Sequence, residues 1–116
     1  MLRTGTYNII CPQGVSYDET FTVTSNGSPM NLSGYSARMQ IRRSYDSDPL
    51  LTLTSGGGGI TLGGAAGTIL VEIAYTTTEA FSSGQYLYDL EITSGANKRD
   101  RLLEGTFTIS REITRA

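Results

Sequence analysis

The chain has 116 residues, a mass of 12.5 kDa and a formal net charge of −2, from nine Lys and Arg residues against eleven Asp and Glu residues. This length predicts one domain with its own core, and the near balance of charge argues against binding nucleic acid or anionic lipid through a bulk field. With one cysteine and no histidine, the chain excludes an intrachain disulfide, a Cys/His zinc site and histidine-based acid–base catalysis.

The N-terminal sequence MLRTGTYNIICPQG lacks the apolar segment of a secretory signal peptide, and no run approaches the roughly 18 to 20 apolar residues of a membrane span. We therefore expect a soluble protein that is made in the cytoplasm and is not associated with a membrane. Cys11 lies beside Ile9 and Ile10, a setting typical of a small buried side chain rather than a reactive thiol.

Short runs of alternating apolar and polar residues, bounded by Gly, Pro, Asn and Ser, predict strands joined by turns. In the first half we expect strands over about 6–11, 17–24 and 35–43. The second of them ends at Asn26-Gly27, a pair that supplies the positive φ values of a tight hairpin. The third is the clearest, because one face carries Tyr35, Ala37, Met39 and Ile41.

In the second half we expect strands over about 50–54, 60–62, 68–75, 85–93 and 101–111. Gly105 in the last of them indicates a bulge or a close backbone approach. The run Gly56, Gly57, Gly58 and Gly59 predicts a flexible loop, and it lacks the Lys-Ser/Thr ending of a phosphate-binding loop. Residues 76–81 are the one candidate for a helical turn.

The segment before the 85–93 strand has the spacing of a tyrosine corner. In immunoglobulin-like domains a tyrosine near the start of a central strand packs its ring inside and bonds its hydroxyl to nearby backbone. Gly84, Tyr86 and Tyr88 fit this pattern, with Tyr88 in place of the disulfide cysteine of antibody domains. The chain is therefore expected to form a single antiparallel immunoglobulin-like β-sandwich of about seven to eight strands over residues 1–116.

The charged residues give no strong catalytic or metal-binding pattern. Asp46-x-Asp48 supplies too few oxygens for calcium and is typical of a turn. Asp89 and Glu91 share a strand face and are expected to oppose arginines such as Arg38 and Arg42 across neighbouring strands, which also argues against a nucleic-acid site. We expect no catalytic residue, metal or cofactor, and place a candidate protein interface at Tyr7, Tyr17, Tyr45 and Gly56 to Gly59.

The whole chain resembles small immunoglobulin-like structural proteins of tailed bacteriophages, such as the N-terminal domain of baseplate upper proteins. The resemblance is carried by Gln13-Gly14, Phe21, the segment from Asn31 to Arg42, the segment from Gly84 to Glu91, and the ending from Leu103 to Arg115. It implies a non-enzymatic virion protein, made in the host bacterial cytoplasm, that forms homo-oligomers and binds other tail, baseplate or fibre proteins.

Two alternatives stay open. One is a capsid decoration or head-fibre protein, which is still a structural role in the virion. The other, of a different class, is a carbohydrate-binding module that uses Asp89, Glu91 or an exposed tyrosine. The closeness of the last expected strand to Ala116 favours an adaptor over a receptor-binding tip.

Overall fold

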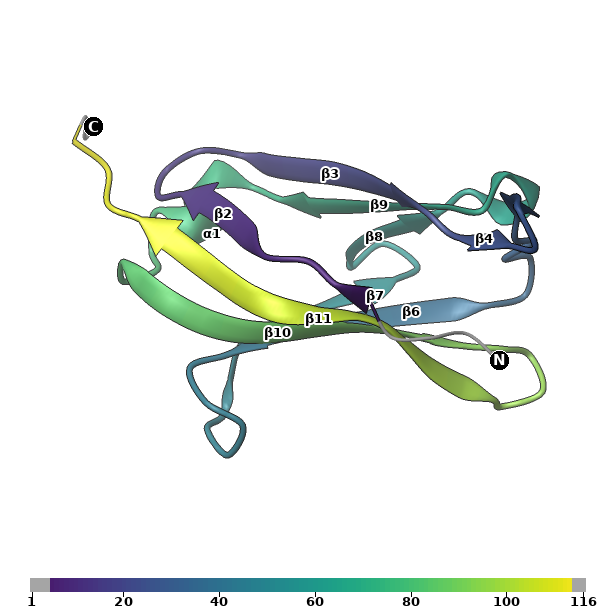
Figure 1. The fold of residues 1–116 in the computed structure, drawn as a ribbon. Helices are drawn as coiled ribbons and strands as arrows, with labels where there is room; N and C mark the ends of the chain where they lie inside the picture. The colour runs from purple at the N-terminus through teal and green to yellow at the C-terminus, as the bar shows by residue number, and fades with distance from the viewer. Residues whose placement is uncertain (1–4, 114–116) are drawn as a thin grey trace.

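The computed structural model describes residues 5–113, which form an all-β fold (Figure 1). A 3-10 helix, η1 (Gly64–Ala66), and one short α-helix, α1 (Tyr75–Thr78), interrupt the strands. The strands in this range are β1 (Gly5–Thr6), β2 (Ile9–Pro12), β3 (Tyr17–Thr22), β4 (Thr24–Ser25), β5 (Ser28–Pro29), β6 (Ser36–Arg42), β7 (Pro49–Ser55), β8 (Gly59–Leu62), β9 (Thr68–Ile73), β10 (Gly84–Thr93) and β11 (Arg99–Ser110).

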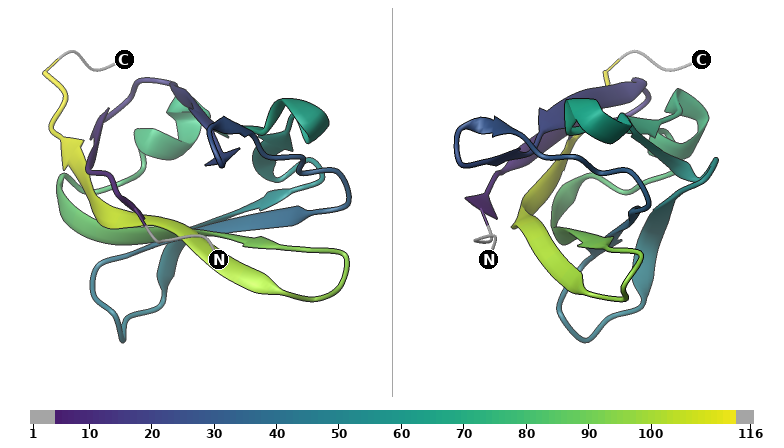
Figure 2. Two further views of the ribbon diagram at one scale, coloured as in Figure 1. Left: turned by 45° about the vertical axis from the view of Figure 1, so that its right-hand side comes forward. Right: turned by 90° about the vertical axis from the view of Figure 1, so that its right-hand side faces the viewer.

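One strongly curled sheet supplies both layers of the fold. Its strand order is β1-β11-β10-β6-β7-β8-β9-β3, with β2 paired to β11, and β4 and β5 form a separate hairpin. Figures 1 and 2 show β6, β10 and β11 in one layer and β3 and β9 in the other, with the chain crossing between them near β7 and β8. The curl buries one face of each strand in a shared core and leaves the other face of β6, β10 and β11 to solvent.

The expectation of a purely antiparallel sheet is wrong, because the sheet is mixed. Both β1 and β2 run parallel to β11, so the first and last strands of the described chain lie side by side. A short parallel pairing also joins β7 to β8. Positive φ values at Gly56, Gly57 and Gly59 let the chain make a tight loop there and re-enter the sheet in the same direction. Parallel partners of this kind leave no local sequence pattern.

Two expected strands are each split in the structure, which raises the number of strands above seven to eight. The 6–11 strand breaks at Asn8, whose side-chain Oδ1 accepts the backbone N–H of Thr106 at 3.1 Å and takes the place of a ladder carbonyl. The 17–24 strand breaks at Val23, which donates to Gly67 O and accepts from Met30 N. The expected helical turn begins one residue early, as α1.

The core is built as the alternation predicts. On β6 the side chains of Ala37, Met39 and Ile41 are buried, and β10 alternates buried and partly exposed residues along its length. Cys11 is fully buried among them, which confirms that it serves as a core side chain. Gly105 is a close-approach glycine, since a Cβ built there would lie 2.5 Å from the carbonyl oxygen of Tyr7.

The glycine run is better ordered than the sequence suggests. Gly58 O accepts the backbone N–H of Thr54 at 3.0 Å, and Gly59 already belongs to β8. A Cβ at Gly59 would lie 2.7 Å from the Leu53 side chain and 3.1 Å from the carbonyl oxygen of Glu72. The expectation of a flexible loop is therefore wrong for Gly58 and Gly59, whereas Gly56 and Gly57 face open space.

Candidate functional site

Tyr86 forms a tyrosine corner at the start of β10. Its ring is buried, and its hydroxyl donates to the carbonyl oxygen of Ser82 at 2.8 Å. Arg43 covers it from outside: Nη2 donates to the Tyr86 hydroxyl at 3.0 Å, and the guanidinium carbon lies 4.8 Å from the ring centroid. Gly84 opens the strand at φ 145°, in the region that favours glycine. These contacts make Tyr86 a structural residue.

Tyr88 ties the N-terminal segment to the core. Its hydroxyl donates to the carbonyl oxygen of Tyr7, and its buried ring meets Phe107 edge-on, with centroids 6.5 Å apart. Burial is the main cause that raises the pKa of Tyr88 above its usual range. Tyr88 thus links the segment between β1 and β2 to β10 by a hydrogen bond.

Tyr7 and Tyr17 are brought together on one carboxylate. Both hydroxyls donate to Glu19, Tyr7 to Oε2 and Tyr17 to Oε1. The Tyr7 ring meets Phe21 edge-on and the Tyr17 ring meets Phe107 edge-on. The pKa of Tyr17 is raised, first by burial and then by the bond to Glu19. Both hydroxyls are therefore already engaged by Glu19 rather than free to bind a partner.

Tyr45, the third tyrosine of the expected interface, lies elsewhere. It is 85% exposed on the 43–48 loop, which projects from the larger layer in Figure 1. Ser44 and Ser47 fix that loop through three hydrogen bonds between them, and Arg42 Nη1 donates to the carbonyl oxygen of Ser47. A fully exposed aromatic side chain is therefore presented on an ordered loop, apart from Tyr7, Tyr17 and the glycine run.

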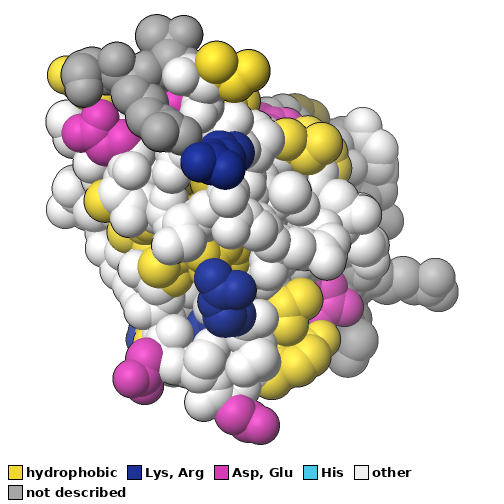
Figure 3. All heavy atoms as spheres, turned by 90° about the vertical axis from the view of Figure 1, so that its left-hand side faces the viewer, with side chains coloured by type: hydrophobic (Ala, Val, Ile, Leu, Met, Phe, Trp, Pro, Cys, Tyr) yellow, Lys and Arg dark blue, Asp and Glu magenta, His cyan; other side chains and the backbone are white. Residues whose placement is uncertain are grey.

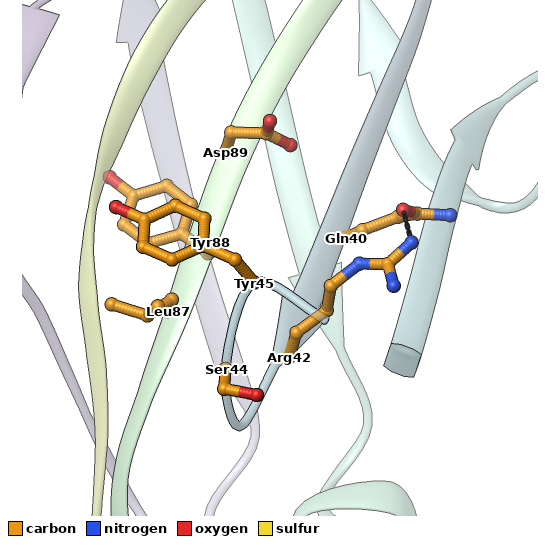
Figure 4. Close-up of a pocket in the computed structure, with 7 residues that line it drawn as sticks. All are labelled: Gln40, Arg42, Ser44, Tyr45, Leu87, Tyr88 and Asp89. Atoms are coloured by element: carbon orange, nitrogen blue, oxygen red, sulfur yellow. Dashed lines mark hydrogen bonds between the residues drawn. The ribbon is translucent and has the colours of Figure 1, made fainter. Parts of the chain in front are cut away.

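Tyr45 stands over the solvent face of β10 (Figure 4) and lines two hollows on that face. The first, of about 290 Å³, is lined by Tyr45, Leu87 and Asp89 together with Gln40, Arg42 and Ser44. The second, of about 350 Å³, shares Tyr45, Leu87 and Asp89 and adds the polar residues Thr6, Asn8, Arg101, Glu104 and Thr106. We call these two hollows the Tyr45 groove.

Several charged side chains that line the Tyr45 groove contact one another or a neighbouring polar group. Arg101 lies 3.5 Å from Asp89 and 3.2 Å from Glu104, and Arg42 Nη2 donates to Gln40 Oε1 at 2.8 Å. Of these contacts, only the Asp89–Arg101 pair joins opposite charges on neighbouring strands, because Arg101 and Glu104 both belong to β11 and Gln40 is neutral. Of the expected arginines, Arg38 lies opposite Glu91 in the β6–β10 register, whereas Arg42 lies opposite Leu87. The pKa of Asp89 is raised by partial burial and by neighbouring Glu91, against the opposing effect of Arg101 and Arg42.

Exposed apolar residues at one end of the molecule lie outside the expected interface of Tyr7, Tyr17, Tyr45 and Gly56 to Gly59. Val15 (49% exposed) sits in the 13–16 loop and Tyr75 (54% exposed) begins α1. The buried hydroxyl of Thr78 fastens the two segments, because its Oγ1 donates to Val15 O at 2.9 Å and lies 3.2 Å from Tyr75 O. We call residues 13–16 and α1 the loop end.

Gln13 also anchors the loop end. Its Nε2 donates to the carbonyl oxygen of Phe81 at 2.7 Å, and its Oε1 accepts the backbone N–H of Glu112 at 3.1 Å. Figure 3 views the molecule from this side, where hydrophobic side chains are spread between separate basic and acidic ones. Nearby, on the outer edge of the sheet, Ile10 of β2 is 70% exposed.

A metal-binding cluster is not found within residues 5–113. No group of three or more Cys, Asp or Glu side chains in that range could hold a metal ion. Burial raises the pKa of the Cys11 thiol, which disfavours the nucleophilic thiolate. In the same range no helix is long and apolar enough to cross a membrane.

No family model and no curated protein sequence matches this chain. Among solved structures it is similar to a family 123 glycoside hydrolase from Clostridium perfringens, described in a structural analysis of glycolipid glycan hydrolysis. The TM-score is 0.50 and the identity 12%, over 98% of this chain and 24% of the hydrolase. The chain thus spans about a quarter of that protein's length, and the likeness shows a shared β fold alone.

Proposed function

We propose that this chain is a non-enzymatic structural protein of a tailed-bacteriophage virion: an adaptor in the tail, baseplate or fibre-attachment region that binds other virion proteins as a homo-oligomer. The sequence motifs set out above support the family. The strand pairing supports an immunoglobulin-like arrangement, since β3 pairs with β9 while β6, β10 and β11 form the facing layer.

One observation carries the binding role, namely the exposed apolar side chains of the loop end. Val15 and Tyr75 are each about half exposed, yet their segments are fixed through Thr78 and Gln13. A rigid segment that already presents apolar side chains loses little conformational entropy when a partner covers it. Tyrosine is also enriched at the centre of protein interfaces and among the residues that contribute most of the binding energy.

Particle composition tests this function. Mass spectrometry of purified particles of the phage that encodes the chain is expected to find it in several copies per virion, and the isolated protein is expected to form a defined oligomer in light scattering. A chain that is monomeric in solution and missing from purified particles would contradict the proposal.

A capsid decoration or head-fibre protein would also be found in particles. Antibody labelling under the electron microscope separates the two structural roles. The proposed adaptor is expected at the tail, the baseplate or the fibre attachment point, whereas label distributed over the head would establish the decoration role instead.

A further inference from the structure

We propose that the Tyr45 groove is a saccharide-binding site, in which the Tyr45 ring stacks on a sugar and the polar residues around it bind the hydroxyl groups. This site is distinct from the loop end and does not depend on the virion role proposed above. It lies on the solvent face of β6, β10 and β11, whereas Val15 and Tyr75 lie in the 13–16 loop and α1.

The first argument is the composition of the groove. Each hollow combines apolar surface, from Tyr45 and Leu87, with side chains that donate and accept hydrogen bonds. Arg42 and Arg101 are donors, Asp89 and Glu104 are acceptors, and Gln40 and Asn8 are both, through their amide groups. A sugar ring presents apolar C–H faces and a rim of hydroxyls that both donate and accept, so it matches this mixture.

The second argument is charge balance. Two arginines face two carboxylates in the groove, so the net charge of its lining is zero and neither an anion nor a cation is favoured over a neutral polar ligand. A protein partner fits less well. The centres of protein interfaces are depleted of charged residues, whereas four charged side chains line the middle of this groove.

The third argument is that the groove is ordered before any ligand binds. The Arg42–Gln40 hydrogen bond and the Arg101 contacts to Asp89 and Glu104 hold the polar groups in place. The Ser44–Ser47 bonds hold the loop that carries Tyr45. Figure 4 shows Tyr45 extending across β10 toward Leu87, with Asp89 farther along β10 and Gln40 and Arg42 reaching out from the neighbouring strand β6. Volumes of about 290 and 350 Å³ lie at the lower end of small-ligand pockets, which suits one sugar unit in each hollow.

A printed array of bacterial and plant oligosaccharides, probed with the labelled full-length chain, tests the proposal. Each bound glycan is then titrated into isotope-labelled protein by NMR. We expect binding on the array, and chemical-shift changes confined to residues 6–8, 40–45, 87–89 and 101–106. Tyr45→Ala is expected to weaken binding at least tenfold, while Tyr45→Phe retains the ring and stays within about threefold of the wild type.

Two further variants sharpen the result. Asp89→Asn removes a charged acceptor and is expected to weaken binding, with folding checked by the NMR spectrum. Tyr75→Ala, the matched exposed tyrosine on the loop end, is expected to leave glycan binding unchanged. A chain that binds no glycan on the array, or whose binding survives Tyr45→Ala, overturns the proposal; if Tyr45→Ala instead removes binding to a virion protein, the groove is a protein interface.

Discussion

The hydroxyl of Tyr86 donates a hydrogen bond to the carbonyl oxygen of Ser82, four residues earlier, at 2.8 Å. The bond fastens the turn before β10 to the strand itself, and Arg43 covers it from the solvent side. Because β10 pairs with both β6 and β11, this corner supports the centre of the larger layer. The chain has one cysteine and can form no intrachain disulfide, so noncovalent contacts of this kind hold its strands together.

Removing the hydroxyl should destabilise the domain measurably. Tyr86→Phe is expected to lower the free energy of unfolding by about 1 to 2 kcal/mol, since the Ser82 carbonyl and the Arg43 side chain both lose a partner. Tyr86→Ala, which also empties the ring site, is expected to cost about 3 to 5 kcal/mol. Urea denaturation measures both values. Tyr45→Phe is the control, and equal stability of Tyr86→Phe and wild type would show that the corner contributes nothing.

Gly105 should tolerate no side chain. A Cβ there would lie 2.5 Å from the backbone oxygen of Tyr7, so Gly105→Ala must push the N-terminal segment away from β11. We expect a loss of about 1 to 3 kcal/mol, as for other overpacked sites. Amide exchange at Tyr7, whose N–H donates to Glu104 O at 3.0 Å, should become faster.

Gly95→Ala is the matched control for that variant. Gly95 lies in the turn between β10 and β11, and a Cβ there would meet only the carbonyl oxygen of Gly34, at an ordinary 3.5 Å. It is expected to keep wild-type stability. An equal effect of the two substitutions would mean that the loss comes from the change of residue type and not from the approach of Tyr7.

Stability should fall in alkaline solution. The pKa values of Tyr17 and Tyr88 are raised in the folded protein, in both cases mainly by burial. In the unfolded chain the pKa of a tyrosine is about 10. A group whose folded pKa exceeds its unfolded pKa contributes stability that is present below the unfolded pKa and is lost as the pH rises above it. The free energy of unfolding is therefore expected to be level up to about pH 9 and to decline beyond about pH 10.

Denaturation at a series of pH values measures this decline. Tyr17→Phe removes one of the tyrosines whose pKa is raised and should make the decline shallower, whereas Tyr45→Phe, at an exposed position, should leave it unchanged. A decline that Tyr17→Phe does not alter would show that buried tyrosines are not its cause.

The strands and the corner could be predicted from the sequence because each depends on residues close together in the chain. Alternation places Ala37, Met39 and Ile41 in the core, and the Gly84-x-Tyr86 spacing indicates the tyrosine whose hydroxyl bonds Ser82. The parallel pairing of β1 and β2 with β11 could not be predicted in the same way, because it joins the two ends of the chain and is specified by no local pattern.

The candidate sites were harder to predict, since they depend on contacts distant in sequence. Tyr7 and Tyr17 look like interface tyrosines until Glu19 and the opposite layer are in place. Val15 looks like an ordinary turn residue, and only the bond from Thr78 shows that it is held exposed beside α1. The strand pattern indicates that Asp89 faces solvent. It does not indicate that Asp89 lines the two hollows with Tyr45, because that depends on where the 43–48 loop lies over the sheet.

The adaptor role is tested most directly by complementing a phage that lacks its own copy of the gene with the wild-type chain or with the Val15→Ser, Tyr75→Ser double variant. Both positions are about half exposed, so the variant is expected to fold, which circular dichroism verifies, and Tyr45→Ser serves as the control. The measurement is the copy number of the chain in purified particles. We expect at least a tenfold loss for the double variant and no loss for the control; incorporation of the folded double variant at the wild-type copy number would contradict the claim that the loop end binds the virion.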